Sequence, residues 1–169
     1  GGRLEDAPEA AARAPPAALP AAVLFCNVAS GRDETAPGGT SKVNRAEVAA
    51  AVSTVRRLRR ELPAAALCVL APYRGQVVAL RRGLARAGLR GIEVATVDGF
   101  QGREQEVVLF SCVRANDEGR LGFLADPRRL NVALTRAQRG LVRPFAHCAL
   151  PTAHCPLLTA HCSLLTAHC

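Results

Sequence analysis

The sequence predicts a single α/β domain built around a mainly parallel β-sheet. Hydrophobic residues make up 49% of the 169 residues but aromatic residues only 4%, so the core must consist of Ala, Val and Leu. Short apolar runs alternate along the chain with segments of helical periodicity, as they do in parallel sheets covered by helices. Several of these runs are apolar throughout, which is typical of strands buried on both faces.

Strands are assigned from continuous apolar runs. Four runs predict strands and a fifth predicts the first part of one: AAVLFCNVA (21–29), ALCVLAP (66–72), IEVATV (92–97), EVVLFSCV (106–113) and GLV (140–142). Parallel sheets place their ligands at the carboxyl ends of the strands. We therefore expect the functional residues to lie in the loops that follow these runs.

Two segments between the strands have apolar residues at helical spacing. The first covers residues 44–61 and ends before Pro63, and its last turn is rich in arginine, which suits the helix dipole. The second covers residues 75–87 and ends at Gly88. Both helices are long enough to cover a sheet of short strands.

A third helical segment, DPRRLNVALTRAQRG (126–140), combines an apolar stripe with four arginines. Asp126 is a suitable N-cap, Pro127 suits the first turn, and Gly140 is a suitable end. The stripe consists of Leu130, Ala133, Leu134, Ala137 and Leu141. Arg129 and Arg136 are seven residues apart and lie on its flank. A solvated basic face explains these arginines as well as a functional role does, so the helix alone does not decide between them.

Charge is distributed unevenly along the chain. Residues 1–40 carry a net charge of −2 and residues 41–142 a net charge of +9, with arginine as 21 of the 22 basic residues. A basic segment favours binding to a phosphate backbone, although genomic composition explains part of an arginine bias. No apolar run reaches the ~18 residues of a membrane span, and no secretory signal is recognisable. We therefore expect an intracellular protein without a membrane partner, in the nucleus or the cytoplasm.

Composition divides the chain into three parts. Residues 1–20 are expected to be an Ala/Pro-rich linker, residues 21–142 the folded domain, and residues 143–169 a disordered low-complexity tail. The tail repeats AHC every seven residues. His and Cys are zinc and copper ligands, but adjacent side chains rarely reach one ion, so a metal-binding tail is only an alternative and no metal site is expected. The other three cysteines, Cys26, Cys68 and Cys112, are interpreted as buried hydrophobic residues.

Four motifs, in this order, resemble the second RecA-like domain of superfamily 1 helicases. The resemblance is to the group that includes the nonsense-mediated-decay RNA helicase, senataxin and the immunoglobulin mu-binding helicase, and it covers about residues 23–142. It rests on SKVNRAE (41–47), LAPYRGQ (70–76), VDGFQGRE (97–104) and RRLNVALTRA (128–137). The resemblance implies a RecA-like fold of the P-loop NTPase type. Since the family normally completes a strand after Leu141 and Val142, and this chain turns to RPFAHC instead, we expect a truncated last strand and an open sheet edge.

The resemblance also implies a nucleotide site. In such helicases ATP and Mg²⁺ lie between two RecA-like domains, and the second domain offers an arginine to the γ-phosphate. Arg136 matches this arginine finger, whose guanidinium stabilises the charge that shifts during phosphoryl transfer. Glu104 matches a residue that reaches the nucleotide, and Arg129 is either a second nucleotide contact or an ion-pair partner. Gln101 and Gly102 match residues that couple the nucleotide cleft to the nucleic-acid path.

The nucleic-acid side is implied in the same way. Pro72, Tyr73, Thr96 and Asp98 match positions along a bound single strand of RNA or DNA. Thr96 is expected to donate to a phosphate, and Asp98 to hold local geometry because its charge has the wrong sign. Tyr73 either stacks on a base, worth about 1–3 kcal/mol, or packs within the fold.

The sequence contains no G-x-x-x-x-G-K-[ST] phosphate loop and no acidic Walker B run. The first RecA-like domain of the family is expected to be a missing partner of this one, with Mg²⁺ and the phosphate-gripping lysine located there. We therefore predict the C-terminal motor domain of an ATP-dependent RNA or DNA helicase that does not hydrolyse ATP alone. The alternative is a non-catalytic nucleic-acid-binding fragment.

Overall fold

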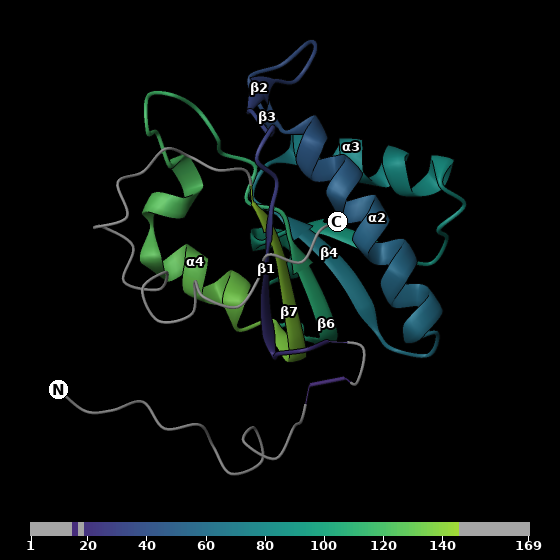
Figure 1. Cartoon of the computed structure of the whole chain (residues 1–169). Coiled ribbons are helices and arrows are strands. Elements are labelled where there is room, and N and C mark those ends of the chain that lie inside the picture. Colours follow the sequence, from purple (N-terminus) through teal and green to yellow (C-terminus); the bar gives the residue numbers. More distant parts are fainter. Residues whose placement is uncertain (1–14, 17–18, 146–169) are drawn as a thin grey trace, which may run out of the picture.

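The computed structural model describes residues 15–16 and 19–145, without the side chain of Phe145. Five parallel strands form one sheet in the order β1-β7-β6-β4-β5 (Figure 1). The strands are β1 (Val23–Asn27), β4 (Leu67–Ala71), β5 (Glu93–Thr96), β6 (Gln105–Phe110) and β7 (Ala137–Phe145). The predicted α/β class with a mainly parallel sheet flanked by helices is confirmed.

Helices cover both faces of this sheet, and each face has its own apolar core. Helices α2 (Arg45–Glu61) and α3 (Arg74–Arg86) lie side by side on one face, and α4 (Pro127–Leu134) lies on the other (Figure 1). A short antiparallel ribbon, β2 (Glu34–Thr35) and β3 (Lys42–Val43), precedes α2. None of the helices in the described part of the chain is long and apolar enough to cross a membrane.

Two single-turn helices and the capped start of α4 complete the connections. The helix η1 (Asp98–Phe100) follows β5, and η2 (Gly122–Ala125) precedes α4. Asp126 caps α4 as predicted, because its carboxylate accepts from Arg128 N at 2.9 Å.

The predicted end of the third helix is wrong. α4 stops at Leu134, and the cap residue Thr135 donates its hydroxyl to Asn131 O at 2.9 Å. Ala137 therefore begins β7 instead of extending the helix stripe, and Arg136 lies between the two elements rather than on the same helix flank as Arg129. Residues 137–145 pair with β6 and β1 in the sheet, and this tertiary pairing overrides the local helical pattern.

The expected truncation of the last strand and the expected open edge beside it are also wrong. β7 has nine residues, extends three residues past the predicted domain boundary at 142, and pairs with β1 on one side and β6 on the other. Gly140 is a strand residue here, and a Cβ at this position would overlap Leu19 Cδ1. Leu19 is only 3% exposed, so the chain just before β1 packs on the sheet. Most of the predicted linker, and the AHC tail from residue 146, lie outside the described residues.

A buried polar cluster joins α2, α3 and the end of β6. Its members are Asn44, Glu47, Gln76 and Ser111, each 0% exposed. Ser111 Oγ donates to the Glu47 carboxylate at 2.5 Å, and Gln76 Nε2 donates to Ser111 Oγ at 2.9 Å. Gln76 Oε1 in turn accepts from Asn44 N at 2.8 Å, and Asn44 Oδ1 caps α2 by accepting from Glu47 N at 3.1 Å. Every buried side-chain N and O atom in the described residues has a partner.

The same cluster holds a strained residue in place. Val113 has a φ of +71°, which β-branched residues rarely adopt. Its N–H donates to the Glu47 carboxylate at 2.9 Å, and its carbonyl accepts from Asn44 Nδ2 at 3.1 Å. Arg114 N donates to Cys112 O at 2.8 Å and closes a three-residue turn around it. The polar cluster therefore sets the direction in which the chain leaves β6.

The spacing in SKVNRAE and LAPYRGQ is explained by this cluster. Asn44 and Glu47 lie one helical turn apart, so both reach the end of β6. Ser41, three residues before Asn44, accepts from Gly75 N at 2.9 Å, and a Cβ on Gly75 would lie 3.1 Å from Lys42 O. These motif residues thus hold the start of α3 against the start of α2.

We predict that Gln76→Leu lowers the free energy of unfolding by about 2–3 kcal/mol, because Asn44 N–H is left buried without its acceptor. Urea unfolding followed by far-UV circular dichroism measures this loss. Gln101→Leu is the matched control, since Gln101 is exposed, and its expected effect is within about 0.5 kcal/mol. Equal effects of the two substitutions would contradict the role given to Gln76.

Candidate functional site

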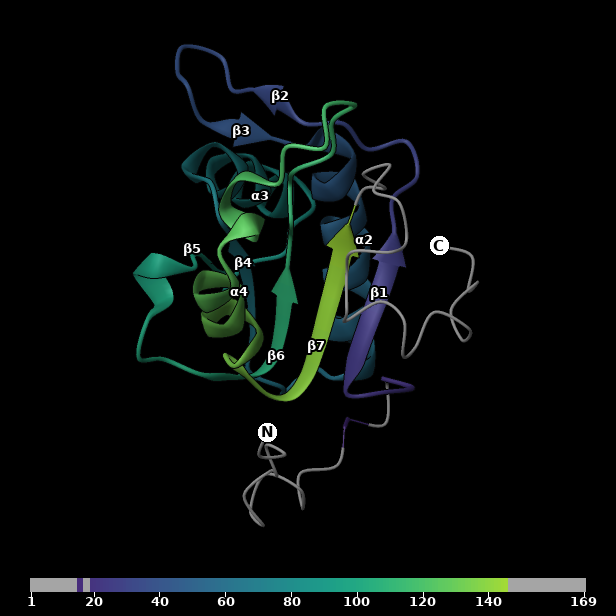
Figure 2. The ribbon, with the colours of Figure 1, turned by 90° about the vertical axis from the view of Figure 1, so that its left-hand side faces the viewer.

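The predicted site residues lie at two opposite edges of the sheet. Pro72 and Tyr73 follow the end of β4, and Thr96 is the last residue of β5, so these three lie at the carboxyl edge. Glu104 and Arg136 directly precede β6 and β7 and lie at the amino edge (Figure 2). The expectation that all the functional residues follow strand ends is therefore wrong. The loop from 97 to 104 crosses from one edge to the other, and β7 begins soon after α4.

Arg136 is half-buried at the amino edge and is held by backbone groups. Its Nε donates to Val132 O at 2.9 Å, in the last turn of α4. Its Nη1 donates to Arg103 O at 3.1 Å, and its Nη2 donates to Thr135 Oγ1 at 3.2 Å. The QGRE segment and the LTRA segment are thus in direct contact. No carboxylate of the described residues forms an ion pair with Arg136, so its positive charge is not neutralised within them.

Glu104 is exposed beside Arg136 and is paired with a residue that sequence reasoning missed. Gln138 Nε2 donates to Glu104 Oε2 at 3.2 Å, and Gln105 N donates to Arg136 O at 3.0 Å. Gln138 is the second residue of β7, and its position opposite Glu104 can be inferred only once the strand is known to begin at Ala137. This part of the edge can therefore present both a carboxylate and a guanidinium.

Gln101 and Gly102 are exposed on the loop between η1 and β6, and Gly102 has a φ of +78°. The loop is anchored on either side of them. Phe100 is 0% exposed, and the Arg103 guanidinium lies 4.6 Å from the centroid of its ring. Arg103 also donates twice to Glu93 on β5, at 2.5 Å each, and this bidentate pair raises the pKa of Arg103. Sequence reasoning missed both Glu93 and Arg103 as anchors.

Arg129 lies in the first turn of α4, at the end of that helix away from Arg136. Its Nε is 3.7 Å from Asp126 Oδ2, and its guanidinium lies 5.5 Å from the centroid of the Phe123 ring. Of the two alternatives for Arg129, the ion-pair partner is the one for which the structure provides contacts.

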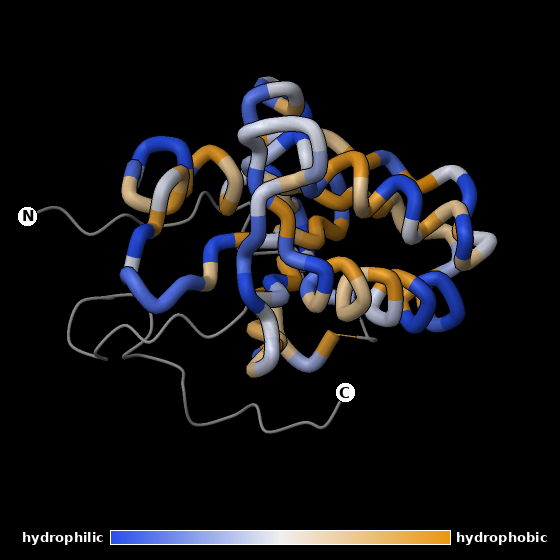
Figure 3. The backbone as a smooth tube through the Cα atoms, turned by 90° about the horizontal axis from the view of Figure 1, so that it is seen from above, coloured by the Kyte–Doolittle hydropathy of each residue, from blue (hydrophilic) through white to orange (hydrophobic). Residues whose placement is uncertain are grey.

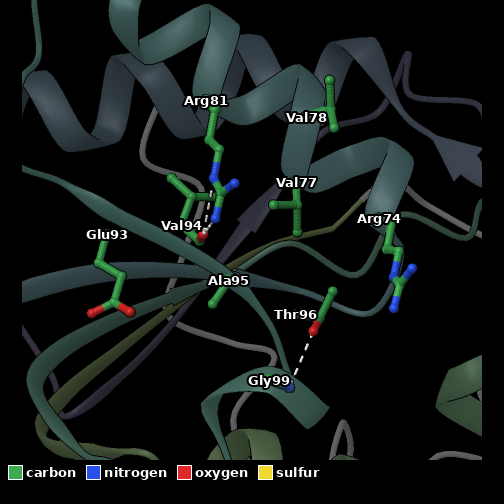
Figure 4. Close-up of a pocket in the computed structure, with 9 residues that line it drawn as sticks. All are labelled: Arg74, Val77, Val78, Arg81, Glu93, Val94, Ala95, Thr96 and Gly99. Carbon is green, nitrogen blue, oxygen red and sulfur yellow. Dashed lines mark hydrogen bonds between the residues drawn. The ribbon is translucent and has the colours of Figure 1, made fainter.

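The carboxyl edge contains a groove of about 460 Å³ between α3 and β5 (Figure 4). Thr96 lies on its wall and accepts from Gly99 N at 3.1 Å through its hydroxyl. Arg81 donates to Val94 O at 2.6 Å, and Arg74 stands at the entrance with its guanidinium exposed (Figure 4). The lining thus offers the hydroxyl of Thr96 and the guanidinium of Arg74 toward the carboxyl end of β5, and the carboxylate of Glu93 at the other end of this strand.

The other predicted residues of the carboxyl edge are Tyr73, Pro72 and Asp98, and each has a different environment. Tyr73 Oη accepts from Phe123 N at 3.2 Å, and its ring packs against both apolar cores, so the packed alternative accounts for its contacts. Pro72 is half-buried, and Asp98 is exposed at the start of η1, where its carbonyl accepts from Gln101 N at 3.4 Å. These three residues shape the edge more than they offer groups to a ligand.

Two of the three isolated cysteines are buried, as predicted, and Cys26 is half-buried. Burial raises the pKa of Cys68 to about 12 and that of Cys112 to about 11, so both are neutral thiols. No group of three His, Cys, Asp or Glu side chains in residues 15–16 and 19–145 can hold a metal ion. The proposed metal ligands of the AHC tail lie outside the described residues.

Comparison with known proteins gives relatives along most of the chain. A family model described as an AAA domain matches residues 1–143. The chain is 42% identical over 131 residues to a Regulator of nonsense transcripts 1 homolog of Arabidopsis thaliana, which covers 73% of this chain and 10% of that protein. It is 42% identical over 119 residues to the ATP-dependent helicase NAM7 of Saccharomyces cerevisiae, and this alignment covers 66% of this chain and 12% of that protein.

Further relatives include a DNA helicase. The chain is 43% identical over 114 residues to the DNA polymerase alpha-associated DNA helicase A of Saccharomyces cerevisiae, with 64% of this chain and 17% of that protein covered. Among solved structures, the C-terminal domain of a possible DNA helicase from Lactobacillus plantarum superposes with a TM-score of 0.48 at 16% identity, covering 77% of this chain and 75% of that one. The chain thus spans less than a fifth of the length of these three curated relatives, between 10% and 17%.

The charge on Glu106 contributes to the stability of the amino edge. Ala66 N donates to one Glu106 carboxylate oxygen at 2.9 Å and Arg139 to the other at 3.3 Å, and both lower the pKa of Glu106. A carboxyl group whose pKa is lowered by folding stabilises the fold above its unfolded pKa of about 4.3, and this contribution is lost as the pH falls through the lower folded value.

We therefore predict that wild type is more stable than Glu106→Gln at pH 6, and that the difference shrinks as the pH falls from about 5 to about 3. Denaturant unfolding across this pH range measures it. Glu61→Gln is a suitable control, since Glu61 is exposed and has no ion pair within the described residues. A difference that stays constant with pH would show that the Glu106 charge does not matter.

Proposed function

Since the chain belongs to the AAA domain family, we propose that it is the C-terminal motor domain of an ATP-dependent RNA or DNA helicase. Its relatives include proteins named as ATP-dependent and DNA helicases. In this proposal the domain supplies Arg136 to ATP at the amino edge of the sheet and part of the nucleic-acid track at the carboxyl edge. A first RecA-like domain elsewhere supplies the phosphate loop and the Mg²⁺ site.

The observation that carries the nucleotide half of the proposal is the uncompensated charge of Arg136. Its three hydrogen bonds go to two carbonyl oxygens and one hydroxyl, all neutral acceptors. These acceptors orient the guanidinium without cancelling its charge, which is what stabilising the γ-phosphate requires. Bound ATP with Mg²⁺ supplies the phosphoryl group. Arg136 stabilises the negative charge on its oxygens, and Glu104 contacts the nucleotide beside it.

The nucleic-acid half rests on the groove at the carboxyl edge. We assign Thr96 to a phosphate, with Pro72 and Tyr73 shaping the path of the strand. Residues 97–104, which include Gln101 and Gly102, connect this groove to Glu104 and end in contact with Arg136. A shift of the loop when ATP engages Arg136 would therefore reach Thr96. This is the proposed coupling between hydrolysis and movement of the strand.

A chimaera tests the nucleotide half. Residues 15–145 replace the aligned segment of the ATP-dependent helicase NAM7 of Saccharomyces cerevisiae, which supplies the rest of the motor. We predict that Arg136→Ala lowers the kcat of nucleic-acid-stimulated ATP hydrolysis by about 10³-fold or more, because an arginine finger typically contributes 10³–10⁵. Arg136→Lys should restore only part of this rate, since lysine lacks the planar fork.

The matched control is Arg128→Ala, since Arg128 is an exposed arginine of α4 without an ion pair in the described residues. Equal rates for Arg136→Ala and Arg128→Ala would overturn the assignment of the finger. A chimaera with the unaltered segment that binds nucleic acid but does not hydrolyse ATP would instead favour the non-catalytic alternative.

A further inference from the structure

Six arginines on the helical layer of α2 and α3 form an exposed basic surface, here called the outer arginine face. They are Arg56, Arg57 and Arg60 of α2, Arg82 and Arg86 of α3, and Arg90 in the turn that follows. All six are exposed, and no side-chain hydrogen bond or ion pair joins any of them to another residue in the described part of the chain. Figure 3 shows hydrophilic stretches near the ends of both helices.

Many of the arginines elsewhere on the domain are paired with carboxylates. Seven of them form ion pairs with carboxylates: Arg32, Arg45, Arg103, Arg114, Arg120, Arg129 and Arg139. α3 contains no acidic residue, and the acidic residues of α2 are the buried Glu47 and the exposed Glu61. A compositional bias toward arginine would supply arginines everywhere, but it does not explain why the exposed surface of α2 and α3 carries a single carboxylate, Glu61, beside these arginines.

The packing of α2 against α3 places their arginines on one helical layer. A Cβ on Gly83 would lie 3.1 Å from methyl groups of Val48 and Val52, so these residues form the contact between α3 and α2. Arg56 follows Val52 by one helical turn on the same ridge, and Arg86 follows Gly83 by nearly one turn. Both helices run from the carboxyl edge toward the amino edge, so both arginines lie on the amino-edge side of this contact.

The spacing within each helix is electrostatically unfavourable in the isolated domain. Arg56 and Arg60 are four residues apart, as are Arg82 and Arg86, and like charges at this spacing repel each other. A bound polyanion would relieve this repulsion. The exposed residues near the arginines include the small Ala49, Ser53 and Ala85, and Val78, 46% exposed, is the one large apolar side chain exposed on these two helices. One aliphatic side chain is not the aromatic-rich centre that is typical of a protein interface.

We propose that the outer arginine face binds the phosphate backbone of a nucleic acid, as a second contact separate from the groove at the carboxyl edge. Guanidinium groups match phosphate oxygens in a bidentate manner, and a row of them binds a backbone without reading its sequence. The proposal depends on the proposed function only for the choice of nucleic acid as the partner. Its test uses no ATP, so either proposal can fail without the other.

The test compares two triple variants of the 169-residue chain that each lose three positive charges. The test variant is Arg56→Gln, Arg82→Gln and Arg86→Gln. The control variant is Arg32→Gln, Arg120→Gln and Arg128→Gln, at exposed positions outside the face. Fluorescence anisotropy with a labelled single-stranded oligonucleotide, repeated from low to moderate salt, gives the binding constant and its salt dependence. Thermal melting confirms that both variants fold.

The test variant should reduce the slope of log K against log salt by about two, since each lost phosphate contact on a single strand removes about 0.7. The control should change it by less than half as much, and the test variant should melt no lower than wild type because repulsion is removed. Equal slopes for the two variants would overturn the proposal. The same anisotropy measurement is repeated with labelled poly-glutamate. If the test variant loses poly-glutamate binding but keeps its oligonucleotide binding, the face binds an acidic polypeptide and the proposal is overturned.

Discussion

The buried polar cluster is the constraint on which the rest of the domain depends. Its four side chains have given up contact with water, so each donor and acceptor must meet a partner inside the fold. Glu47 shows this most clearly, because one carboxylate oxygen accepts from both Ser111 Oγ and Val113 N. The observed arrangement of α2, α3 and β6 satisfies these groups together. Apolar packing alone would permit small shifts of the helices, whereas the hydrogen bonds determine where α3 starts and how the chain leaves β6.

The two edges of the sheet derive their geometry from this arrangement in different ways. At the carboxyl edge, the position of α3 sets one wall of the groove that Thr96 borders. The amino edge is instead organised by the loop of residues 97–104, which the pairing of Arg103 with Glu93 and the burial of Phe100 hold on the sheet. Arg136 then takes its orientation from the carbonyl of Arg103. The loop is thus the physical connection between the nucleotide and nucleic-acid residues of the proposed motor.

Local sequence patterns predicted all five strand positions and the first two helices, because continuous apolar runs and helical periodicity depend on neighbours in the chain. They failed where contacts with residues distant in sequence determine the secondary structure. Ala137 fits a helix stripe and a strand equally well, and only its pairing with Gln105 of β6 places it in the sheet. For the same reason the resemblance assigned Glu104 and Arg136 to one nucleotide but did not place them at the amino edge. The contacts of Gln138, Glu93 and Glu47 depend on which elements lie next to each other in the fold. No local sequence pattern contains this information.

Native-state hydrogen exchange at the Val113 amide tests the central claim most directly, because this N–H donates to Glu47 inside the cluster. If the cluster joins α2, α3 and β6 into one cooperative unit, this amide exchanges only when the whole domain unfolds. Its opening free energy then equals that of the amides in β4 and falls by the same amount with added denaturant. An opening free energy several kcal/mol below that of β4, with little dependence on denaturant, would contradict the claim and show that the end of β6 opens by itself.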